Sequence, residues 1–372
     1  MAKTLEERLK RVRERTAELA TRDEFSGVLH VQRGEETLLS SAHGIASRRW
    51  GIPVRASTRF DIASVTKVLT AIAVLQLVDA GPLGLDDRIH DYVELTDSAI
   101  HPNVTLRQLL SHTSGIGDDA DEEAGESYEA LWQERPNYSV TETQDFLPQF
   151  VHKPANFAPG EGCRYCNVGY ILLGLAIENV TGERYRDVVR RAVMEKTGMR
   201  DSGFFDMRHA VKDVAEGWEP VRSSAEGPIE AWRQNIYSYP PIGSPDGGAH
   251  ATAADLVRML DAVLQGRILS TESTAMFRSP QALHHRVDNP EPGGTAELHY
   301  AFGLEIELDA HGRMRSLYKD GINTGASAIV RHYPAGDRPG ITLAVVANSE
   351  DAAWEPVRLL DDAIIGFGSD RA

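Results

Sequence analysis

The chain has 372 residues, of which 41% are hydrophobic and 25% are charged, and its formal net charge at pH 7 is −16. Such a length suits one large or two medium globular domains. The acidic balance argues against nucleic acid and anionic membranes as partners, because both require a basic surface, and two cysteines are too few for a secreted disulfide framework.

The first predicted element is a charged amphipathic helix, which Thr4 and Glu7 open as a capping box. The first 25 residues contain no apolar core of the signal-peptide kind, and we find no run of eighteen apolar residues in the chain. We therefore expect no membrane association and a cytoplasmic location. Residues 25–47 alternate apolar and polar side chains around a glycine-containing turn, which predicts a β-hairpin.

Residues 61–81, DIASVTKVLTAIAVLQLVDAG, predict one buried helix that Gly81 ends. Ser64 and Lys67 are three residues apart, so on a helix the hydroxyl and the amine lie one turn apart on the same face. Burial, the helix N-terminus and any second cation lower the pKa of a lysine from ~10.4, and the neutral amine can then activate the serine. A lysine reaching solvent from a surface helix is the alternative, but this stretch offers no polar face.

From about Leu83 to about Gln281 the pattern is mostly helical. Apolar side chains recur with a helical period in residues 168–180, 184–199 and 251–266, and a capping signal runs from Thr252 to Asp255. Residues 117–134 carry eight carboxylates and no Lys or Arg. We interpret them as a solvated loop, with a negative rim favouring cationic substrates as the alternative. Residues 217–248 predict a long loop. Loops of this length in compact enzymes often line an active site.

Tyr165 and Asn167 precede the apolar stretch at 168–180. A tyrosine at the mouth of a buried helix can pass a proton, and an asparagine two residues on can hold a lysine or a substrate amide. A packed tyrosine with a capping asparagine is the alternative. Cys163 and Cys166 flank Tyr165, and we interpret them as small packing residues, because no second pair completes a zinc site. A redox switch is the other interpretation.

From about His299 the pattern returns to strands, followed by a closing helix at 354–367. The predicted strands lie at 299–308, 313–321, 326–334 and 341–349, with turns at 309–312 and 334–340. Lys319 lies on one of these strands, and Gly321 and Gly325 follow it. A cation thus stands beside an edge free of side chains, where a substrate can lie along the backbone.

Three histidines are candidates for other chemistry, but the sequence lacks the partners that this chemistry needs. No G-x-S-x-G sequence accompanies His112, so we interpret it as a structural loop residue and not as part of a Ser-His-Asp triad. His284 and His285 lack a third ligand at metal spacing, and we assign them to a loop. We expect neither a metal nor a cofactor.

The order S-x-x-K, Y-x-N and a Lys-x-Gly strand resembles the class C β-lactamases and their esterase, D-aminopeptidase and transacylase relatives. The segments that look like this family, in the family's order, are residues 44–67, 105–116, 157–174, 247–259, 300–306 and 321–330. The resemblance implies an α/β, β-lactamase/transpeptidase-like fold with an antiparallel sheet flanked by helices. We accordingly expect a sheet domain from residues 1–85 and 292–372, an inserted helical domain over 86–291, and the active site between them.

The resemblance also implies roles for individual residues. Ser64 would be the acylated nucleophile, Lys67 its base partner, and Tyr165 the proton relay to the leaving group and the deacylating water. Asn167 would orient Lys67 and substrate, and Lys319 would keep Tyr165 acidic. 

The backbone N–H groups of Ser64 and Ile322 would form the oxyanion hole, with Asp320 and Gly321 beside the substrate. Asp320 stands where the β-lactamases have Thr or Ser, whose hydroxyl helps hold the antibiotic carboxylate. An aspartate repels that group, which argues against penicillin hydrolysis.

We therefore expect a serine hydrolase that acts through an acyl-enzyme on small esters or amides. The alternatives within the family are a D-amino-acid peptidase or amidase and an acyltransferase, followed by a true β-lactamase. A scaffold protein without catalysis is a further alternative from a different class, although the chain keeps nucleophile, base and tyrosine. The sequence leaves the natural substrate and the oligomeric state open.

Overall fold

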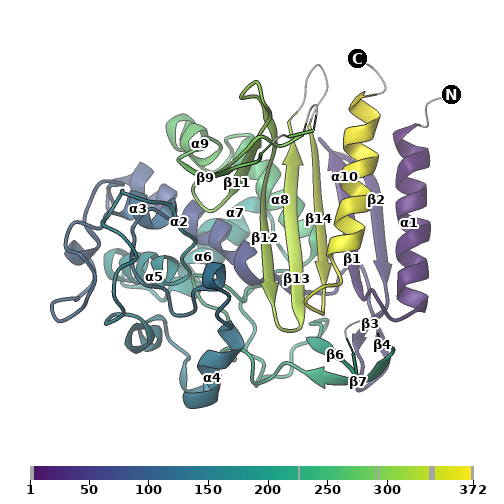
Figure 1. The fold of residues 1–372 in the computed structure, drawn as a ribbon, viewed down its shortest axis with the longest axis horizontal. Coiled ribbons are helices and arrows are strands. Elements are labelled where there is room, and N and C mark those ends of the chain that lie inside the picture. The colour runs from purple at the N-terminus through teal and green to yellow at the C-terminus, as the bar shows by residue number, and fades with distance from the viewer. Residues whose placement is uncertain (1–3, 225–226, 289, 292–293, 335–339, 370–372) are drawn as a thin grey trace.

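The structure, a computed structural model, describes residues 4–224, 227–288, 290–291, 294–334 and 340–369. Figure 1 shows a central antiparallel sheet with two long helices beside its N-terminal strands and a helical region on the other side. The sheet has eight strands in the order β2-β1-β14-β13-β12-β11-β10-β9. These strands are β1 (Gly27–Arg33), β2 (Glu36–His43), β9 (Ala282–Arg286), β10 (Glu297–Tyr300), β11 (Glu305–Leu308), β12 (Met314–Asn323), β13 (Ala326–Tyr333) and β14 (Ile341–Ala347).

The sheet joins the two ends of the chain, because β1 pairs with β14 and places Val28 opposite Val346. The predicted antiparallel sheet built from both termini is therefore confirmed. Of the two predicted turns that join the C-terminal strands, the one at 334–340 lies mostly outside the described residues, which omit 335–339.

The two terminal helices, α1 (Leu5–Thr21) and α10 (Trp354–Ser369), cover one face of the sheet beside each other. The predicted capping box is present, since the Glu7 backbone N–H donates to Thr4 Oγ1 at 3.2 Å and Thr4 N–H donates to Glu7 Oε2 at 2.9 Å. Apolar side chains of both helices, such as Leu9 and Leu360, join the inner strands in one buried cluster. This layer covers one face of the sheet, and the helical region packs on the opposite face.

The helix predicted over 61–81 begins later than expected. Residues Phe60–Asp61 form strand β5, which pairs with β8 (His250–Ala251), and a 3₁₀ turn over Ala63–Val65 precedes helix α2 (Thr66–Ala80). The Asp61 carboxylate accepts from the Ala63 backbone N–H at 2.7 Å, which stabilises the turn instead of a first helical turn. Gly81 ends the helix as predicted, with φ at 95°.

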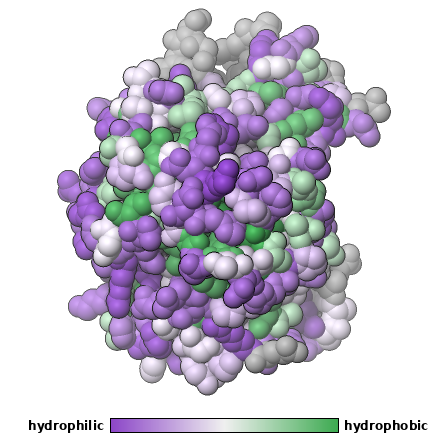
Figure 2. All heavy atoms as spheres, turned by 90° about the vertical axis from the view of Figure 1, so that its left-hand side faces the viewer, coloured by the Kyte–Doolittle hydropathy of each residue, from purple (hydrophilic) through white to green (hydrophobic). Residues whose placement is uncertain are grey.

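Among the described residues, Ala63–Ala80 is the one helical segment of 18 residues apolar enough to cross a membrane, and 67% of it is buried inside the protein. The expectation that no eighteen-residue stretch qualifies was wrong, because the apolar residues outweigh Lys67 and Asp79 in the mean hydropathy. Its burial is that of a core helix. On the face of the helical region in Figure 2, hydrophilic side chains dominate and apolar ones appear in separate patches.

The helical region contains the three predicted helical stretches. Residues 168–180 lie in α5, 184–199 form two helices joined by a π-helical segment, and 251–266 contain α8, where the Asp255 N–H donates to the Thr252 hydroxyl at 3.1 Å. Its helices are α3 (Leu106–Leu110), α4 (Leu131–Glu134), α5 (Val168–Thr181), α6 (Tyr185–Val189), α7 (Glu195–Thr197), α8 (Ala253–Leu264) and α9 (Thr271–Phe277). Short 3₁₀ segments lie at Ile89–Asp91, Glu122–Ala124, Tyr128–Ala130, Asn137–Ser139 and Thr143–Gln149, and the π-helical segment is Arg190–Met194.

One sequence expectation about this region needs correction. The loop predicted at 217–248 contains a hairpin, β6 (Trp218–Arg222) with β7 (Ile229–Gln234), whose half-exposed strands have no clear apolar alternation. Strands β3 (Ile45–Ser47) and β4 (Ile52–Pro53) pair nearby.

The predicted, mainly helical domain over 86–291 also contributes to the main sheet. It supplies edge strand β9 to the main sheet, and its helix α8 packs on β14 and β1. The two-domain division therefore stays a prediction, and its boundary at 291 falls after a strand of the sheet.

Candidate active site

Ser64 lies on the 3₁₀ turn at the entrance to α2, and Lys67 is the second residue of that helix. Lys67 Nζ lies 3.1 Å from Ser64 Oγ. Lys67 is fully buried, and Nζ also donates to Asn167 Oδ1 and to the backbone carbonyl of Asp246, both at 2.7 Å. A neutral amine has two N–H donors and one lone pair, so it can keep both of these bonds while it accepts the Ser64 proton.

The electrostatic surroundings of Lys67 favour this neutral form. Burial lowers the pKa of Lys67 below its usual value, and the positive charge of Lys319 lowers it further. The carboxylates of Asp246, Glu122 and Asp118 act in the opposite direction without reversing the shift. A lysine with a lowered pKa beside a serine hydroxyl is the arrangement that nucleophilic catalysis requires.

The Tyr165 hydroxyl completes the group, because it donates to Ser64 Oγ at 2.8 Å. Both Lys67 Nζ and Lys319 Nζ lie 5.0 Å from the centre of its ring. Burial nevertheless raises the pKa of Tyr165 well above its usual value, and Lys319 only moderates the rise. Lys319 therefore acts in the expected direction, since its positive charge lowers the pKa of Tyr165, but burial outweighs it. The phenol faces the serine as a hydrogen-bond donor.

Lys319 is held by two carboxylates and does not stand as a free cation. Its Nζ donates to Glu305 Oε1 at 2.8 Å and to Asp320 Oδ1 at 3.1 Å. Burial alone lowers the pKa of Lys319, but Glu305, Tyr165 and Asp320 raise it well above the usual value. The sequence did not identify Glu305 as its partner, because the two residues meet only when β11 pairs with β12.

Gly321 brings strand β12 against the Ser64 turn. A Cβ at this position would lie 2.5 Å from the Ile62 carbonyl oxygen and 2.7 Å from the Ser64 nitrogen. Such a contact requires the backbone to move. The next residue, Ile322, lines the same pocket as Ser64. The edge along which a substrate can lie stays a prediction.

Gly321→Ala is expected to lower kcat/KM by about 100-fold, because a small displacement of β12 from Ser64 misplaces the reacting groups. Hydrolysis of a p-nitrophenyl ester measures this effect, and thermal unfolding shows how much of it is a stability loss. Gly169→Ala is the control, since a Cβ there meets its nearest neighbour at an ordinary 3.5 Å. Equal activity of the two variants would contradict the close approach.

The acidic stretch at 117–134 is solvated only in part. Asp118 and Asp119 are buried, and the Asp118 carboxylate accepts from the backbone N–H groups of Asn167 and Val168 at 2.8 and 3.0 Å, at the start of α5. A carboxylate at a helix N-terminus satisfies unpaired donors and complements the helix dipole. Burial raises the pKa of Asp118 to about 6 despite these bonds. The interpretation as a solvated loop was therefore wrong for Asp118 and Asp119, whereas Glu122, Glu123 and Glu126 are exposed.

Two histidines also contribute to the site in ways the sequence did not indicate. His112 is buried with φ at 59°, its Nδ1 accepts from the Cys166 backbone N–H at 3.1 Å, and its ring centre lies 4.7 Å from that of Tyr165. Burial lowers its pKa well below the usual value, so it is a neutral packing group. His284 lies on β9 and not in a loop, 3.5 Å from the Glu123 carboxylate.

The two cysteines beside Tyr165 are both free thiols, with Cys166 buried and Cys163 partly buried. Burial raises the pKa of Cys163 to about 12, and it raises that of Cys166 well above the usual value. Protonated thiols of this kind are poor nucleophiles and poor metal ligands. Across the described ranges, no group of three or more His, Cys, Asp or Glu side chains is arranged to hold a metal ion.

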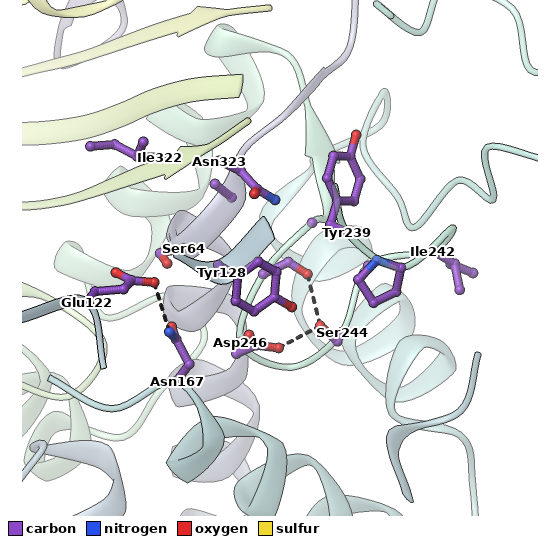
Figure 3. A pocket seen from close by; sticks show the side chains of 15 residues that line it. Ser64, Glu122, Tyr128, Asn167, Tyr239, Ile242, Ser244, Asp246, Ile322 and Asn323 are labelled. Atoms are coloured by element: carbon purple, nitrogen blue, oxygen red, sulfur yellow. Dashed lines mark hydrogen bonds between the residues drawn. The ribbon is translucent and has the colours of Figure 1, made fainter. Parts of the chain in front are cut away.

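Ser64 lies between two hollows. The first has an empty volume of about 460 Å³ and is walled by Tyr128, Tyr239, Ile242 and Asn323 among others (Figure 3). The second has an empty volume of about 670 Å³. Its lining includes four carboxylates and two basic groups, namely Glu122, Glu123, Glu305, Asp320, Lys319 and His284. A substrate carbonyl at Ser64 would thus have on one side a space with aromatic and apolar walls that also contains Glu122 and Asp246, and on the other side a space with four carboxylates.

A protein-family model described as Beta-lactamase matches residues 10–363 of the chain. Esterase EstB of Burkholderia gladioli is 34% identical over 252 residues, which cover 63% of this chain and 64% of that protein. Penicillin-binding protein 4* of Bacillus subtilis is 26% identical over 296 residues, covering 78% of this chain and 61% of that protein. The chain thus spans less than two thirds of these curated relatives.

A penicillin-binding protein from Bacillus halodurans has a similar solved structure, with a TM-score of 0.82 and 32% identity over 95% of this chain and 99% of that one. The match to the family model extends over nearly the whole chain and includes the Ser64, Tyr165 and Lys319 stretches. The chain belongs to the Beta-lactamase family and has the β-lactamase/transpeptidase-like fold.

Proposed function

We propose that this protein is a serine hydrolase that cleaves small esters or amides through an acyl-enzyme on Ser64. One observation carries the proposal: Ser64 Oγ lies 3.1 Å from the buried amine of Lys67 and 2.8 Å from the Tyr165 hydroxyl. The similarity to a protein named as an esterase supports ester substrates. The presence of nucleophile, base and tyrosine together argues against a scaffold protein without catalysis.

In the acylation step, neutral Lys67 accepts the Ser64 proton while Oγ attacks the carbonyl carbon of the substrate. The negative oxygen that develops is bound by the backbone N–H groups of Ser64 and Ile322, which the close approach at Gly321 brings together. As the bond to the leaving group breaks, Tyr165 donates its proton to the leaving oxygen or nitrogen. The resulting phenolate takes the proton from Lys67, and the positive charge of Lys319 stabilises it meanwhile.

Deacylation runs through the same groups in reverse. A water molecule replaces the leaving group, gives its proton to Lys67, which is neutral again after acylation, and attacks the acyl carbon. Ser64 recovers its proton as the acid product leaves. Asn167 holds Lys67 throughout, since its side-chain oxygen accepts from Nζ at 2.7 Å.

The second hollow favours substrates that carry an amine. Glu122, Glu123, Glu305 and Asp320 give it four carboxylates, and the one lysine there is already paired with two of them. A substrate carboxylate, such as that of a penicillin, meets repulsion in this space, whereas an ammonium group meets attraction. This charge favours a D-amino-acid amidase or peptidase as the second candidate.

Asp320→Thr is expected to lower the preference for an amine-bearing ester over a matched neutral ester by about 3- to 10-fold in kcat/KM. The effect is modest because the carboxylate is 38% exposed and solvent screens it. Asp97→Thr removes an exposed acid elsewhere and serves as the matched control. An unchanged ratio in Asp320→Thr would reject the amine preference.

Intact-mass measurement tests the proposed function directly. The protein is exposed to an activated phosphonate and to a panel of p-nitrophenyl esters, and we expect one added group on Ser64 that is stable for the phosphonate and transient for the esters. Added alcohol or amine that diverts the product would identify an acyltransferase, because water and acceptor compete for the same acyl-enzyme. A protein that takes up no label and releases no p-nitrophenol would contradict the proposal.

The finer expectations on location and domains stay predictions. Cell fractionation tests the cytoplasmic location, and limited proteolysis tests whether residues 86–291 behave as a separate unit. The oligomeric state remains open.

A further inference from the structure

The acidic residues between Asp118 and Glu123 hold the stretch that carries Tyr165 and Asn167. Asp121 accepts from the Arg164 guanidinium at 2.6 Å, and Glu123 Oε1 accepts from the Tyr165 N–H at 2.9 Å. Asp118 accepts from the N–H groups of Asn167 and Val168. Glu122 Oε1 accepts from Asn167 Nδ2 at 3.0 Å. Three of these four acids bind main-chain donors or a neighbouring arginine. Glu122 alone binds the side chain of a residue that touches the base.

The Asn167 amide is held between two opposite partners. Its oxygen accepts from Lys67 Nζ at 2.7 Å, and its nitrogen donates to Glu122 Oε1 at 3.0 Å, as the dashed line in Figure 3 marks. The two ends of an asparagine amide have nearly the same shape, so the hydrogen-bond partners decide which end faces which way. A flipped amide would turn its NH₂ group toward Lys67 and present a donor where the amine needs an acceptor.

We propose that Glu122 is a positioning residue of this active site, whose carboxylate keeps the Asn167 amide oriented with its oxygen toward Lys67. A carboxylate is an acceptor only, so it selects the NH₂ end of the amide and leaves the oxygen for the lysine. This inference rests on the proposed function, because it assigns Glu122 an effect on the base of the same reaction.

The placement of Glu122 suits this role. It lies in the wall of both hollows beside Ser64, on the 3₁₀ turn Glu122–Ala124. Its side chain is solvent-exposed, in contrast to the buried Asp118 and Asp119. A substitution here therefore removes a hydrogen bond at the mouth of the pocket without opening a cavity in the core.

Two substitutions separate the hydrogen bond from the charge. Glu122→Leu removes both, and we expect the plateau of kcat to fall about tenfold with little change in KM. Glu122→Gln keeps an oxygen that can accept from Asn167, so most of the plateau should be retained. Glu161→Gln, which neutralises an exposed acid elsewhere, is the matched control.

The pH profile of kcat/KM distinguishes this role from a purely structural one. The negative charge of Glu122 raises the pKa of Lys67, so both Glu122 variants should shift the ascending limb of kcat/KM to lower pH, whereas only Glu122→Leu lowers the plateau. The other charged or titratable groups that face Lys67 are unchanged in both variants, namely Asp246, Lys319, Asp118, His112, Tyr165 and Tyr170.

A double-mutant cycle decides whether Glu122 acts through Asn167. If it does, Glu122→Leu combined with Asn167→Ala should be no slower than Asn167→Ala alone. A wild-type plateau in Glu122→Leu, or effects that multiply in the double variant, would overturn the proposal. Thermal unfolding checks each variant, and Glu122→Ala replaces Glu122→Leu if the leucine prevents folding. Full turnover in Ser64→Ala would instead contradict the proposed function, so the two failures are distinguishable.

Discussion

Ser64→Ala is expected to lower kcat/KM for p-nitrophenyl esters by about 10⁴-fold or more and to abolish labelling by a phosphonate. The reason is the position of the hydroxyl, whose oxygen contacts both the Lys67 amine and the Tyr165 phenol. Removal of this oxygen leaves a base and an acid with no group to activate. Any residual rate reflects binding and the oxyanion donors acting on water.

Ser40→Ala, an exposed serine on strand β2, is the control and should keep full activity. Ser64→Ala should also unfold at nearly the wild-type temperature, since the turn is held by Asp61 and not by the serine side chain. Turnover by Ser64→Ala within tenfold of wild type would refute the assignment of the nucleophile. Labelling of a residue other than Ser64 would refute it equally.

Much of the fold could be predicted from periodicity. The apolar helical stripe at 168–180 and the alternation in the strands around Lys319 are local patterns, and both are found as predicted. The start of the nucleophile's helix could not be predicted in this way, because residues 61–65 are as apolar as the helix itself. The pairing of β5 with β8, the Asp61 bond to Ala63 and the bond from the Ile62 N–H to the Ala249 carbonyl hold this segment outside the helix.

The residues of the site could be predicted from the sequence, but their electrostatic surroundings could not. The spacing of Ser64 and Lys67 predicts their contact, because three residues make nearly one helical turn. The state of Tyr165 depends on burial, which outweighs the nearby lysine, and burial is a property of the assembled fold. Likewise, Lys319 is neutralised by Glu305 only through the pairing of two strands.

The acidic stretch illustrates the same limit. Eight carboxylates without a lysine or arginine among them are typical of solvated loops, and composition alone gives no other indication. Its first residues are buried because the start of α5 offers unpaired N–H groups that Asp118 satisfies. Contacts of this kind join segments about fifty residues apart, and no local sequence pattern indicates them.

Lys67→Met is expected to lower kcat/KM by about 10² to 10⁴-fold, because it removes the base and keeps the apolar volume of the buried side chain. In the wild-type protein the neutral amine is the active form, so activity should rise with pH through the pKa of Lys67. Burial lowers this pKa, and the ascending limb should therefore lie below the usual lysine value. The rate profile between about pH 5 and pH 10 measures the limb.

Lys67→Arg separates the charge of this residue from its basicity. A guanidinium keeps the positive charge and the donors to Asn167 and the Asp246 carbonyl, but it stays protonated throughout the accessible pH range. The ascending limb should then disappear and the rate should stay as low as in Lys67→Met, with folding checked by thermal unfolding. If Lys67→Arg instead retained activity near the wild-type level, the charge of residue 67 would be what matters, and the proton from Ser64 would have to pass to another group.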